Sequence, residues 1–404
     1  MFRLITDIKE LFSHKEIFLN LFICIVWGNY LLGALRGVVN HLPVLCDVTD
    51  EIEIACVIIP LILALPAIIN RLTLLDYTIF FSLVLSYGID YIIHPYNTEI
   101  LNEHAFDTLC IVFPMYFVGR FIDIKRHYNI FCVISALCIV WTLFYYLSYA
   151  QQHKVIEEVA GDDNMYTAYA VLPHIIMLSW AYLKKFNIVY FVLTFLGILF
   201  LLSCGTRGPF AGVIFFYLCY FFLFMNFKYA YILKCTIISL GMIVISFLHD
   251  IIFYLAYTFA NLKLSTRILE KFVDGEIGND SGRGAIVKSL LHITDTKGNF
   301  FGLGYFGVER FYYNYSHNFF ADHIIYFGYI LGPILLLAIF TLIATAIYKA
   351  KDKTERCFLI CILSFTLLKL FLSSTIIKEP FYYMLIGYCV SIAFFNVRKE
   401  NSSK

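Results

Sequence analysis

Charged side chains are scarce in this chain. Asp, Glu, Lys and Arg supply 15% of its 404 residues, whereas a soluble globular protein carries about 25%. The formal net charge is +1 and no basic tract occurs, so nothing in the sequence favours a nucleic-acid partner. Hydrophobic residues reach 61%, and the mean hydropathy is +0.78. This composition predicts an all-α protein that crosses a membrane many times.

No cofactor and no metal site is expected from the motifs. The twelve cysteines do not form a secreted disulfide framework, and most lie in apolar runs, where Cys acts as a small hydrophobe. Cys357 and Cys361 would share a helix face, but a zinc site needs more ligands than this pair. Residues 302–307 match G-x-G-x-x-G, yet no strand precedes them, so a dinucleotide site is not predicted. These glycines are expected to form tight turns that aim the following segment.

Twelve apolar runs approach the length of about 20 residues that a membrane-spanning helix needs. They are 17–35, 54–69, 77–93, 108–122, 129–150, 166–183, 186–202, 210–224, 231–247, 324–348, 358–372 and 380–395. The second is short and holds Pro60 and Pro66, and the fourth carries Arg120 near its end, so ten or eleven spans stay open. No cleavage site follows the first run, which is expected to be a retained span.

The charges of the connecting segments support twelve spans with both termini in the cytoplasm. In that topology the cytoplasmic segments hold most of the Lys and Arg, as cytoplasmic loops usually do. The short outer loops hold only Arg36, Lys154, Arg207 and Lys378. Residues 1–260 then contain spans one to nine, and residues 317–404 contain spans ten to twelve and a short cytoplasmic tail.

Residues 261–316 form one long outer, periplasmic loop in this topology. Apolar residues recur at helical spacing in residues 264–273 and again in a second stretch, at Ile286, Val287, Leu290 and Leu291. Both stretches are expected to be short amphipathic helices on the membrane surface. Because long loops in compact proteins are usually functional, this loop is expected to carry the active face.

The segment 315–320 reads Tyr-Ser-His-Asn-Phe-Phe and joins this loop to the tenth span. His317 can accept a proton near neutral pH. Tyr315, Asn318 and Asp322 lie close to it in the sequence. The alternative is that His317 is only a solvated residue at the membrane boundary.

Two arginines are expected at helix starts on the outer side. Thr206 precedes Arg207, Ser281 precedes Arg283, and either hydroxyl can cap the helix that follows. Pro209 suits the first position of its helix. A helix N-terminus favours an anion, and a guanidinium adds bidentate phosphate binding. The two arginines are therefore interpreted as a clamp for a diphosphate.

Simpler roles for these cations stay open. Arg207 could anchor its helix to lipid headgroups, and Arg283 could form a surface salt bridge with Asp280 or Glu276. Lys369 lies inside the eleventh span, where an ionisable side chain is a functional suspect. It could also extend its amine outward to the membrane surface.

In their order along the chain, these motifs resemble the superfamily of O-antigen polymerases and O-antigen ligases. A Gly-x-Arg-Gly segment (205–208) precedes a span, and the long periplasmic loop that comes later opens with an Arg-bearing helix. A Phe-Gly-x-Gly turn (301–304) follows, and His317 with Asn318 leads into a span interrupted by glycine. By motif order the resemblance covers residues 165–395.

Within this superfamily the polymerases look closer. Residues 368–374, followed by Pro380 and Phe381, look like the ending of the polymerases. Ser316 departs from the common pattern, in which Pro or a small apolar residue precedes the His. Asp322 stands where a Glu is frequent. These departures leave the acidic partner of His317 open.

The resemblance implies a metal-independent glycosyltransferase of the bacterial inner membrane that makes lipopolysaccharide O-antigen. The donor would be a glycan on undecaprenyl diphosphate, and the acceptor a hydroxyl of a new lipid-linked repeat unit. Arg207 and Arg283 would stabilise the departing diphosphate, His317 would take the proton of the acceptor, and Asn318 would hold the imidazole or the sugar. A chain-length regulator is the implied protein partner, beside membrane lipid. The other residues expected to contact substrate are Thr206, Ser281, Tyr315, Lys369 and Asp322.

Two other functions stay open. An O-antigen ligase would use the same donor but transfer the glycan to lipid A-core. A glycolipid transporter should show repeat-related halves or helices broken at mid-membrane. The polar motifs gather at one predicted face instead, which favours chemistry at the membrane surface.

Overall fold

The computed structural model describes residues 16–28, 49–152, 161–204, 206–224, 254, 257–258, 283–312 and 315–395. Every regular element among these residues is a helix, as the sequence predicts. Four helices are long and apolar enough to cross a membrane, namely Leu74–Ile93, Ile124–Phe144, Arg207–Phe224 and Phe319–Lys349. The architecture is therefore all-helical and compatible with a membrane protein. The predicted span 231–247 and the predicted loop helix 264–273 lie outside the described residues.

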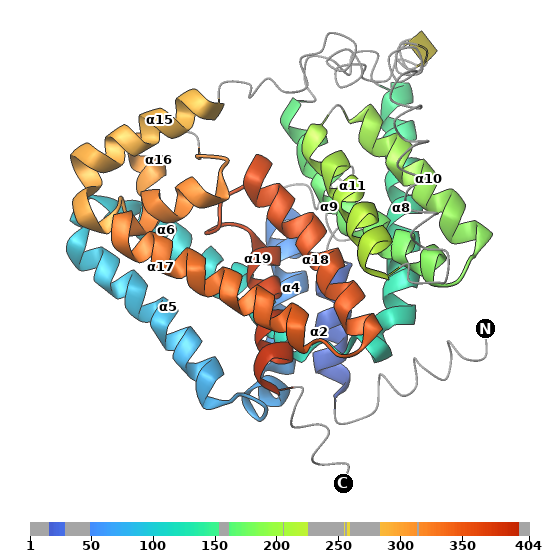
Figure 1. Cartoon of the computed structure of the whole chain (residues 1–404), viewed down its shortest axis with the longest axis horizontal. Helices are drawn as coiled ribbons and strands as arrows, with labels where there is room; N and C mark the ends of the chain where they lie inside the picture. Colours follow the sequence, from blue (N-terminus) through green and yellow to red (C-terminus); the bar gives the residue numbers. More distant parts are fainter. Residues whose placement is uncertain are drawn as a thin grey trace. The chain divides into compact units, whose positions relative to one another are not determined.

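The described residues form two compact units (Figure 1). The first unit contains residues 16–28, 49–130, 283–312, 315–359 and 370–395, and the second contains 131–152, 161–204, 206–224, 254, 257–258 and 360–369. Two helices, α8 (Ile124–Gln152) and α18 (Lys353–Leu372), contribute residues to both units.

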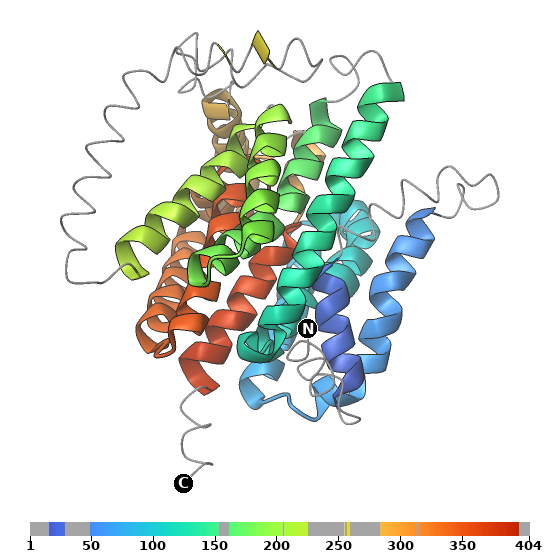
Figure 2. The same cartoon turned by 90° about the vertical axis from the view of Figure 1, so that its right-hand side faces the viewer.

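The second unit is a bundle built around α9 (Gly161–Lys184), with α10 (Ile188–Ser203) and α11 (Arg207–Phe224) beside it (Figure 2). Residues 171–181 of α9 are all buried. Gly197 of α10 lies against Ile175 of α9, and Gly212 of α11 lies against Leu172. Small residues at these contacts let apolar helices approach closely, which is how helices associate in membranes.

The first unit contains the other helices. They are α2 (Ile17–Trp27), α4 (Thr49–Ile69), α5 (Leu74–Ile93), η2 (Pro95–Asn97), α6 (Thr98–Phe106), η3 (Asp107–Val112), α7 (Met115–Phe121), α15 (Arg283–Ile293), η5 (Thr294–Gly298), η6 (Asn299–Phe301), α16 (Gly307–Phe311), α17 (Phe319–Lys349), α19 (Pro380–Val390) and η7 (Ser391–Phe395). Helices α7 and α19 touch at two glycines, where Gly119 lies against the backbone of Met384 and Gly387 against that of Tyr116. A side chain at either glycine would force the two backbones apart.

The fourth predicted span contains a buried arginine that the structure explains. The Nε atom of Arg120 donates to Asp76 Oδ1 at 3.0 Å, and the hydroxyl of Tyr116 donates to the same oxygen at 2.7 Å. The guanidinium also lies 3.6 Å from the centre of the Phe395 ring. Because the charge is paired and covered by an aromatic face, Arg120 is compatible with an otherwise apolar helix.

The tenth predicted span, which glycine interrupts in the sequence, is not one straight helix. A straight helix of the 31 residues in α17 would separate Phe320 from Phe340 by about 30 Å, but their rings stack with centroids 6.0 Å apart. The backbone reverses at Gly328, whose φ is 77°. Helix α17 is thus a hairpin with a short arm (319–327) and a long arm (329–349).

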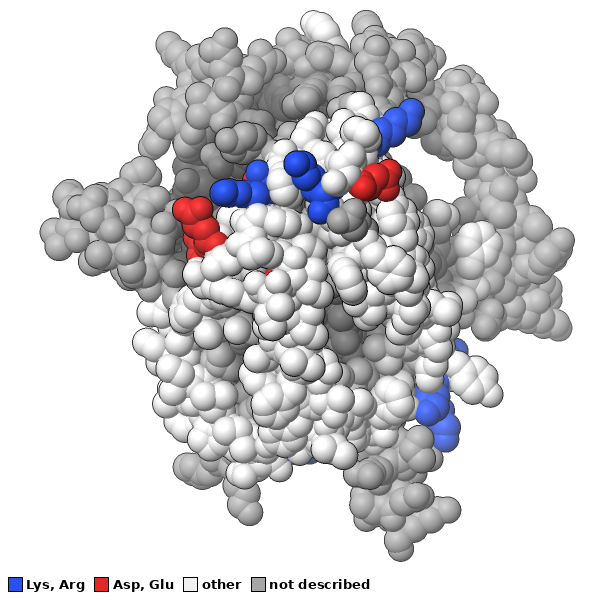
Figure 3. All heavy atoms as spheres, turned by 90° about the vertical axis from the view of Figure 1, so that its left-hand side faces the viewer, with Lys and Arg blue, Asp and Glu red and all other residues white. Residues whose placement is uncertain are grey.

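Helices α5 and the long arm of α17 present apolar side chains to the outside. Phe81, Leu85 and Ile92 of α5 are 61%, 63% and 81% exposed, and Leu337 of the long arm is 69% exposed. On the face in Figure 3, uncharged surface covers a broad area, and most charged side chains gather near the upper edge. An apolar band with charge at its border is what a lipid-facing surface requires.

Candidate functional site

His317 lies at the sharp junction between the loop and the short arm of α17. Its φ is 50°, in the left-handed region that a residue with a side chain seldom adopts. The ring of Tyr315 meets the His317 ring edge-on, with centroids 5.5 Å apart. Such strained backbone positions recur at functional sites, where the surrounding structure holds them in place.

Ser316 and Asp322 hold this strained junction. The buried hydroxyl of Ser316 donates to Asp322 Oδ1 at 2.5 Å and accepts from the Asn318 N–H at 3.0 Å. The other carboxylate oxygen of Asp322 accepts from the Ile376 N–H at 3.2 Å. The Asp322 carboxylate therefore bonds to Ser316, which in turn bonds to Asn318, and to the α18–α19 connection, rather than to the imidazole.

Asn318 is the N-terminal cap of the short arm. Its side-chain oxygen accepts hydrogen bonds from the N–H groups of Phe320 and Ala321, at 3.0 and 3.1 Å. This satisfies two of the N–H groups that a helix start leaves without partners. The side-chain oxygen of Asn318 thus serves the helix, and the expected contact of Asn318 with the imidazole or a sugar stays a prediction.

Arg283 acts on His317 through its charge. It is the first described residue of α15, and Ser281, its predicted cap, lies outside the described residues, so the predicted helix start stays a prediction. Burial, and after it the positive charge of Arg283, lowers the pKa of His317. Both causes favour the neutral imidazole, the form that can accept a proton. The buried Nδ1 atom of His317 makes no hydrogen bond to any residue that the structure describes.

The glycine turn at 302–304 caps the far end of the short arm. The N–H groups of Leu303 and Gly304 donate to the carbonyls of Ile325 and Tyr326, at 2.7 and 3.1 Å. These carbonyls belong to the last turn of the short arm, where a helix leaves its C=O groups without partners. Gly302 has a φ of 77°. The predicted role of these glycines, tight turns that position the segment, is confirmed.

Three side chains hold the same turn from the other side, and sequence reasoning missed them. His94 Nδ1 lies 2.5 Å from Asp90 Oδ1, and its Nε2 lies 3.1 Å from the Gly302 carbonyl. The second oxygen of Asp90 accepts from the Tyr305 N–H at 2.9 Å, and Asn97 donates to the Leu303 carbonyl at 2.7 Å. The available signal was an Asp and a His four residues apart at the end of an apolar run.

The connection between α18 and α19, residues 373–379, bonds to the short arm of α17 beside Asp322. The hydroxyl of Thr375 donates to the Tyr326 hydroxyl at 3.0 Å, and both side chains are buried. With the bond from Ile376 to Asp322, this ties the connection to the short arm at two points. The site therefore combines three chain segments: 283–312, 315–327 and 373–379.

The second unit contains the other predicted site residues. Arg207 is the first residue of α11, as predicted. The predicted cap is wrong, because the buried hydroxyl of Thr206 makes no hydrogen bond within the described residues. Pro209 is the third helical residue rather than the first. The Nζ atom of Lys369 lies 5.7 Å from the centre of the Tyr169 ring, in the range of a cation–π contact. The clamp of two arginines stays a prediction.

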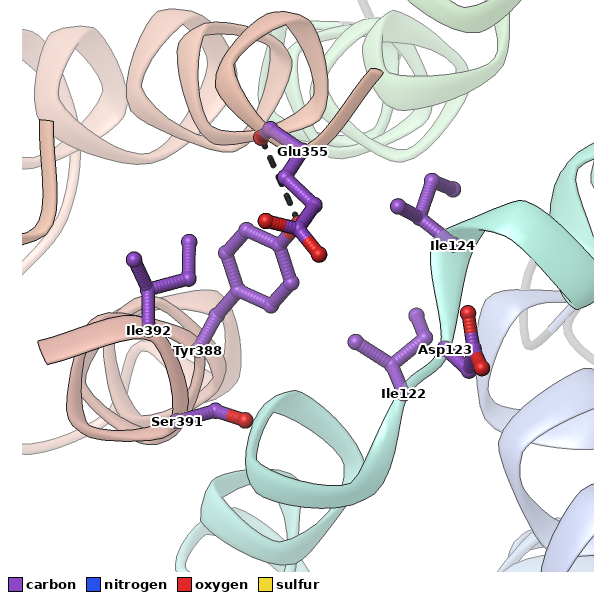
Figure 4. A pocket seen from close by; sticks show the side chains of 7 residues that line it. All are labelled: Ile122, Asp123, Ile124, Glu355, Tyr388, Ser391 and Ile392. Atoms are coloured by element: carbon purple, nitrogen blue, oxygen red, sulfur yellow. Dashed lines mark hydrogen bonds between the residues drawn. The ribbon is translucent and has the colours of Figure 1, made fainter. Parts of the chain in front are cut away.

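A small cavity of about 30 Å³ lies elsewhere in the first unit (Figure 4). Its lining includes Asp123, Glu355 and Tyr388, and the hydroxyl of Tyr388 donates to the Glu355 carbonyl at 3.3 Å. The cavity has room for about two water molecules, and none of the predicted site residues lines it. No group of three or more His, Cys, Asp or Glu suited to a metal ion occurs within the described residues.

Comparisons with known proteins identified no relative of this chain. No protein-family model matches the chain, and neither a curated protein nor a solved structure resembles it significantly.

Proposed function

We propose that this chain is a membrane-embedded glycosyltransferase of the O-antigen polymerase type. It transfers a growing glycan from undecaprenyl diphosphate to a hydroxyl of a new lipid-linked repeat unit. In this proposal the chain spans the bacterial inner membrane twelve times, and residues 261–316 lie on the periplasmic side. The order of the sequence motifs and the all-helical, apolar architecture support the proposal.

The environment of His317 is the observation that carries the proposal. Its backbone is strained, its neighbours are fixed by Ser316 and Asp322, and its Nδ1 has no hydrogen-bond partner within the described residues. A buried polar atom without a hydrogen-bond partner needs an explanation. Accepting a proton from a substrate is one such explanation. Burial, and after it the charge of Arg283, lowers the pKa of His317 and so favours the neutral ring.

The reaction follows from these groups. The acceptor oxygen forms a bond to the anomeric carbon of the donor while the bond from that carbon to the diphosphate oxygen breaks. The electron pair of the broken bond stays on the diphosphate, whose added charge Arg283 and Arg207 stabilise. His317 takes the proton that the acceptor hydroxyl loses. Direct displacement of this kind inverts the configuration at the anomeric carbon.

One observation favours the transporter alternative, since α17 is broken at Gly328 and broken helices occur at transport sites. The carbonyls at this break, however, accept hydrogen bonds from Leu303 and Gly304 and do not line an open path. Because the protein's own N–H groups occupy the break, α17 resembles a fixed support for a site at the membrane surface more than a gate that moves during transport.

Purified protein mixed with lipid-linked repeat units tests the proposal. A polymerase converts them into a ladder of lengths on a gel, and His317→Ala at the same protein level does not. Movement of the lipid across vesicles without a ladder would identify a transporter. In cells, loss of a polymerase leaves a single capped repeat unit, whereas loss of a ligase leaves bare core.

A further inference from the structure

Lys378, in the connection between α18 and α19, joins three segments of the first unit. Its Nζ atom lies 2.6 Å from Glu309 Oε1 in α16. The other carboxylate oxygen, Oε2, lies 3.1 Å from His104 Nε2 in α6. One carboxylate is therefore shared between an ammonium group and an imidazole, so it is not dedicated to Lys378 alone.

The same ammonium group lies beside the candidate site. Its Nζ atom is 5.9 Å from the centre of the Tyr315 ring, and that ring meets His317 edge-on. It is also 5.6 Å from the centre of the buried Phe306 ring. The Lys378 side chain is 35% exposed. A cation over two aromatic faces, with a third of its surface open, is accessible to a ligand that binds next to Tyr315.

The direction of the Lys378 side chain is unusual for a lysine in a short outer loop. In the proposed topology the short outer loops hold four Lys or Arg residues, and Lys378 is one of them. A lysine at a membrane surface usually reaches headgroups or water, but this one turns toward Glu309 and Tyr315. Its four-carbon stem can carry the ammonium group from one anion to another without moving the backbone.

We propose that Lys378 is a ligand of the donor diphosphate, added to Arg283, and that Glu309 holds its ammonium group until the donor arrives. The inference rests on the proposed function, which supplies the diphosphate. On binding, the ammonium group exchanges the Glu309 carboxylate for a phosphate oxygen, while Glu309 keeps its bond to His104. Arg283 contributes the planar fork and Lys378 a mobile point charge.

Three variants of the full-length protein separate this role from a purely structural ion pair. Lys378→Gln removes the cation, Lys378→Arg keeps it, and Glu309→Gln removes the competing carboxylate. The probe is inorganic diphosphate, measured both as a competitive inhibitor of ladder formation and by its effect on the thermal unfolding midpoint. Lys297→Gln, at an exposed lysine of η5, is the matched control.

A ligand role predicts that Lys378→Gln raises the inhibition constant of diphosphate about tenfold or more, since a charge-assisted hydrogen bond is lost. Lys378→Arg retains most of the affinity, and Glu309→Gln does not weaken it. Equal inhibition constants for wild type and Lys378→Gln overturn the inference. The inference is also overturned if Lys378→Gln and Glu309→Gln weaken diphosphate inhibition equally and lower the unfolding midpoint equally. That result indicates an ion pair that only stabilises the fold. A wild-type protein that forms no ladder and does not respond to diphosphate refutes the proposed function itself.

Discussion

Replacing Gly302 with alanine should displace the turn that caps the short arm of α17. The φ of 77° at Gly302 costs an alanine about 1–2 kcal/mol. The added Cβ would also lie 2.6 Å from the Gly328 nitrogen and 2.7 Å from the Ile325 oxygen, which are backbone atoms that cannot rotate away. If the turn moves off, the bonds from Leu303 and Gly304 are lost, at about 1 kcal/mol each. The expected destabilisation is about 2–5 kcal/mol.

The unfolding midpoint of the purified protein in detergent measures this effect. Gly88→Ala is the matched control, because Gly88 lies inside α5 and an added Cβ meets nothing within 4 Å. An alanine inside a helix is expected to stabilise it by about 0.5–1 kcal/mol. The midpoint should therefore fall for Gly302→Ala and hold or rise for Gly88→Ala. Equal midpoints for Gly302→Ala and wild type would show that the turn does not support the short arm.

Four further predictions concern the proposed reaction and topology. His317→Ala should lower turnover about 10²–10⁴-fold at an unchanged protein level. His317→Gln should be as inactive as His317→Ala if the ring accepts a proton. Ladders of normal length from both variants would remove His317 from the mechanism. Arg283→Gln removes a charge that lowers the pKa of His317, so activity should begin to fall at a higher pH as the medium is acidified, and an unshifted acidic limb argues against the base role. Arg207→Lys should polymerise poorly because it loses the planar fork; normal activity would make Arg207 a lipid anchor. A reporter fused at Gly275 should be active only as a periplasmic reporter, and a cytoplasmic signal there contradicts the topology.

Local sequence patterns predicted the helices of the described residues well. The predicted run 77–93 corresponds to α5 (Leu74–Ile93), and the run 186–202 corresponds to α10 (Ile188–Ser203). Apolar length and the caps at helix starts determine such elements, and both are visible within one segment of the chain. Arg207 begins α11, as predicted, although the predicted Thr206 cap is absent among the described residues.

Features that depend on distant contacts were not predicted. Glycine interrupts the tenth span in the sequence, but apolar side chains continue on both sides of Gly328, so a full reversal of the chain there was not predicted. The reversal needs the turn at 302–304, which supplies the hydrogen bonds. Likewise Asp90 bonds to the backbone of Tyr305, 215 residues away, and no local pattern indicates that partner. The bonds from Asp322 to Ser316 and Ile376, which support the backbone around His317, were not predicted either, while its expected contact with substrate stays a prediction.

The capped end of the short arm also has a consequence for biogenesis. Carbonyl groups left without donors in an apolar environment cost several kcal/mol each, so Ile325 and Tyr326 need Leu303 and Gly304 already in place. Ribosomal synthesis delivers the parts in that order: Asp90 first, then the turn, then the short arm, and finally the α18–α19 connection that bonds to the short arm. Each segment of the site is thus synthesised after the segment that it contacts. A nascent chain can therefore assemble the site without breaking contacts that it has already formed.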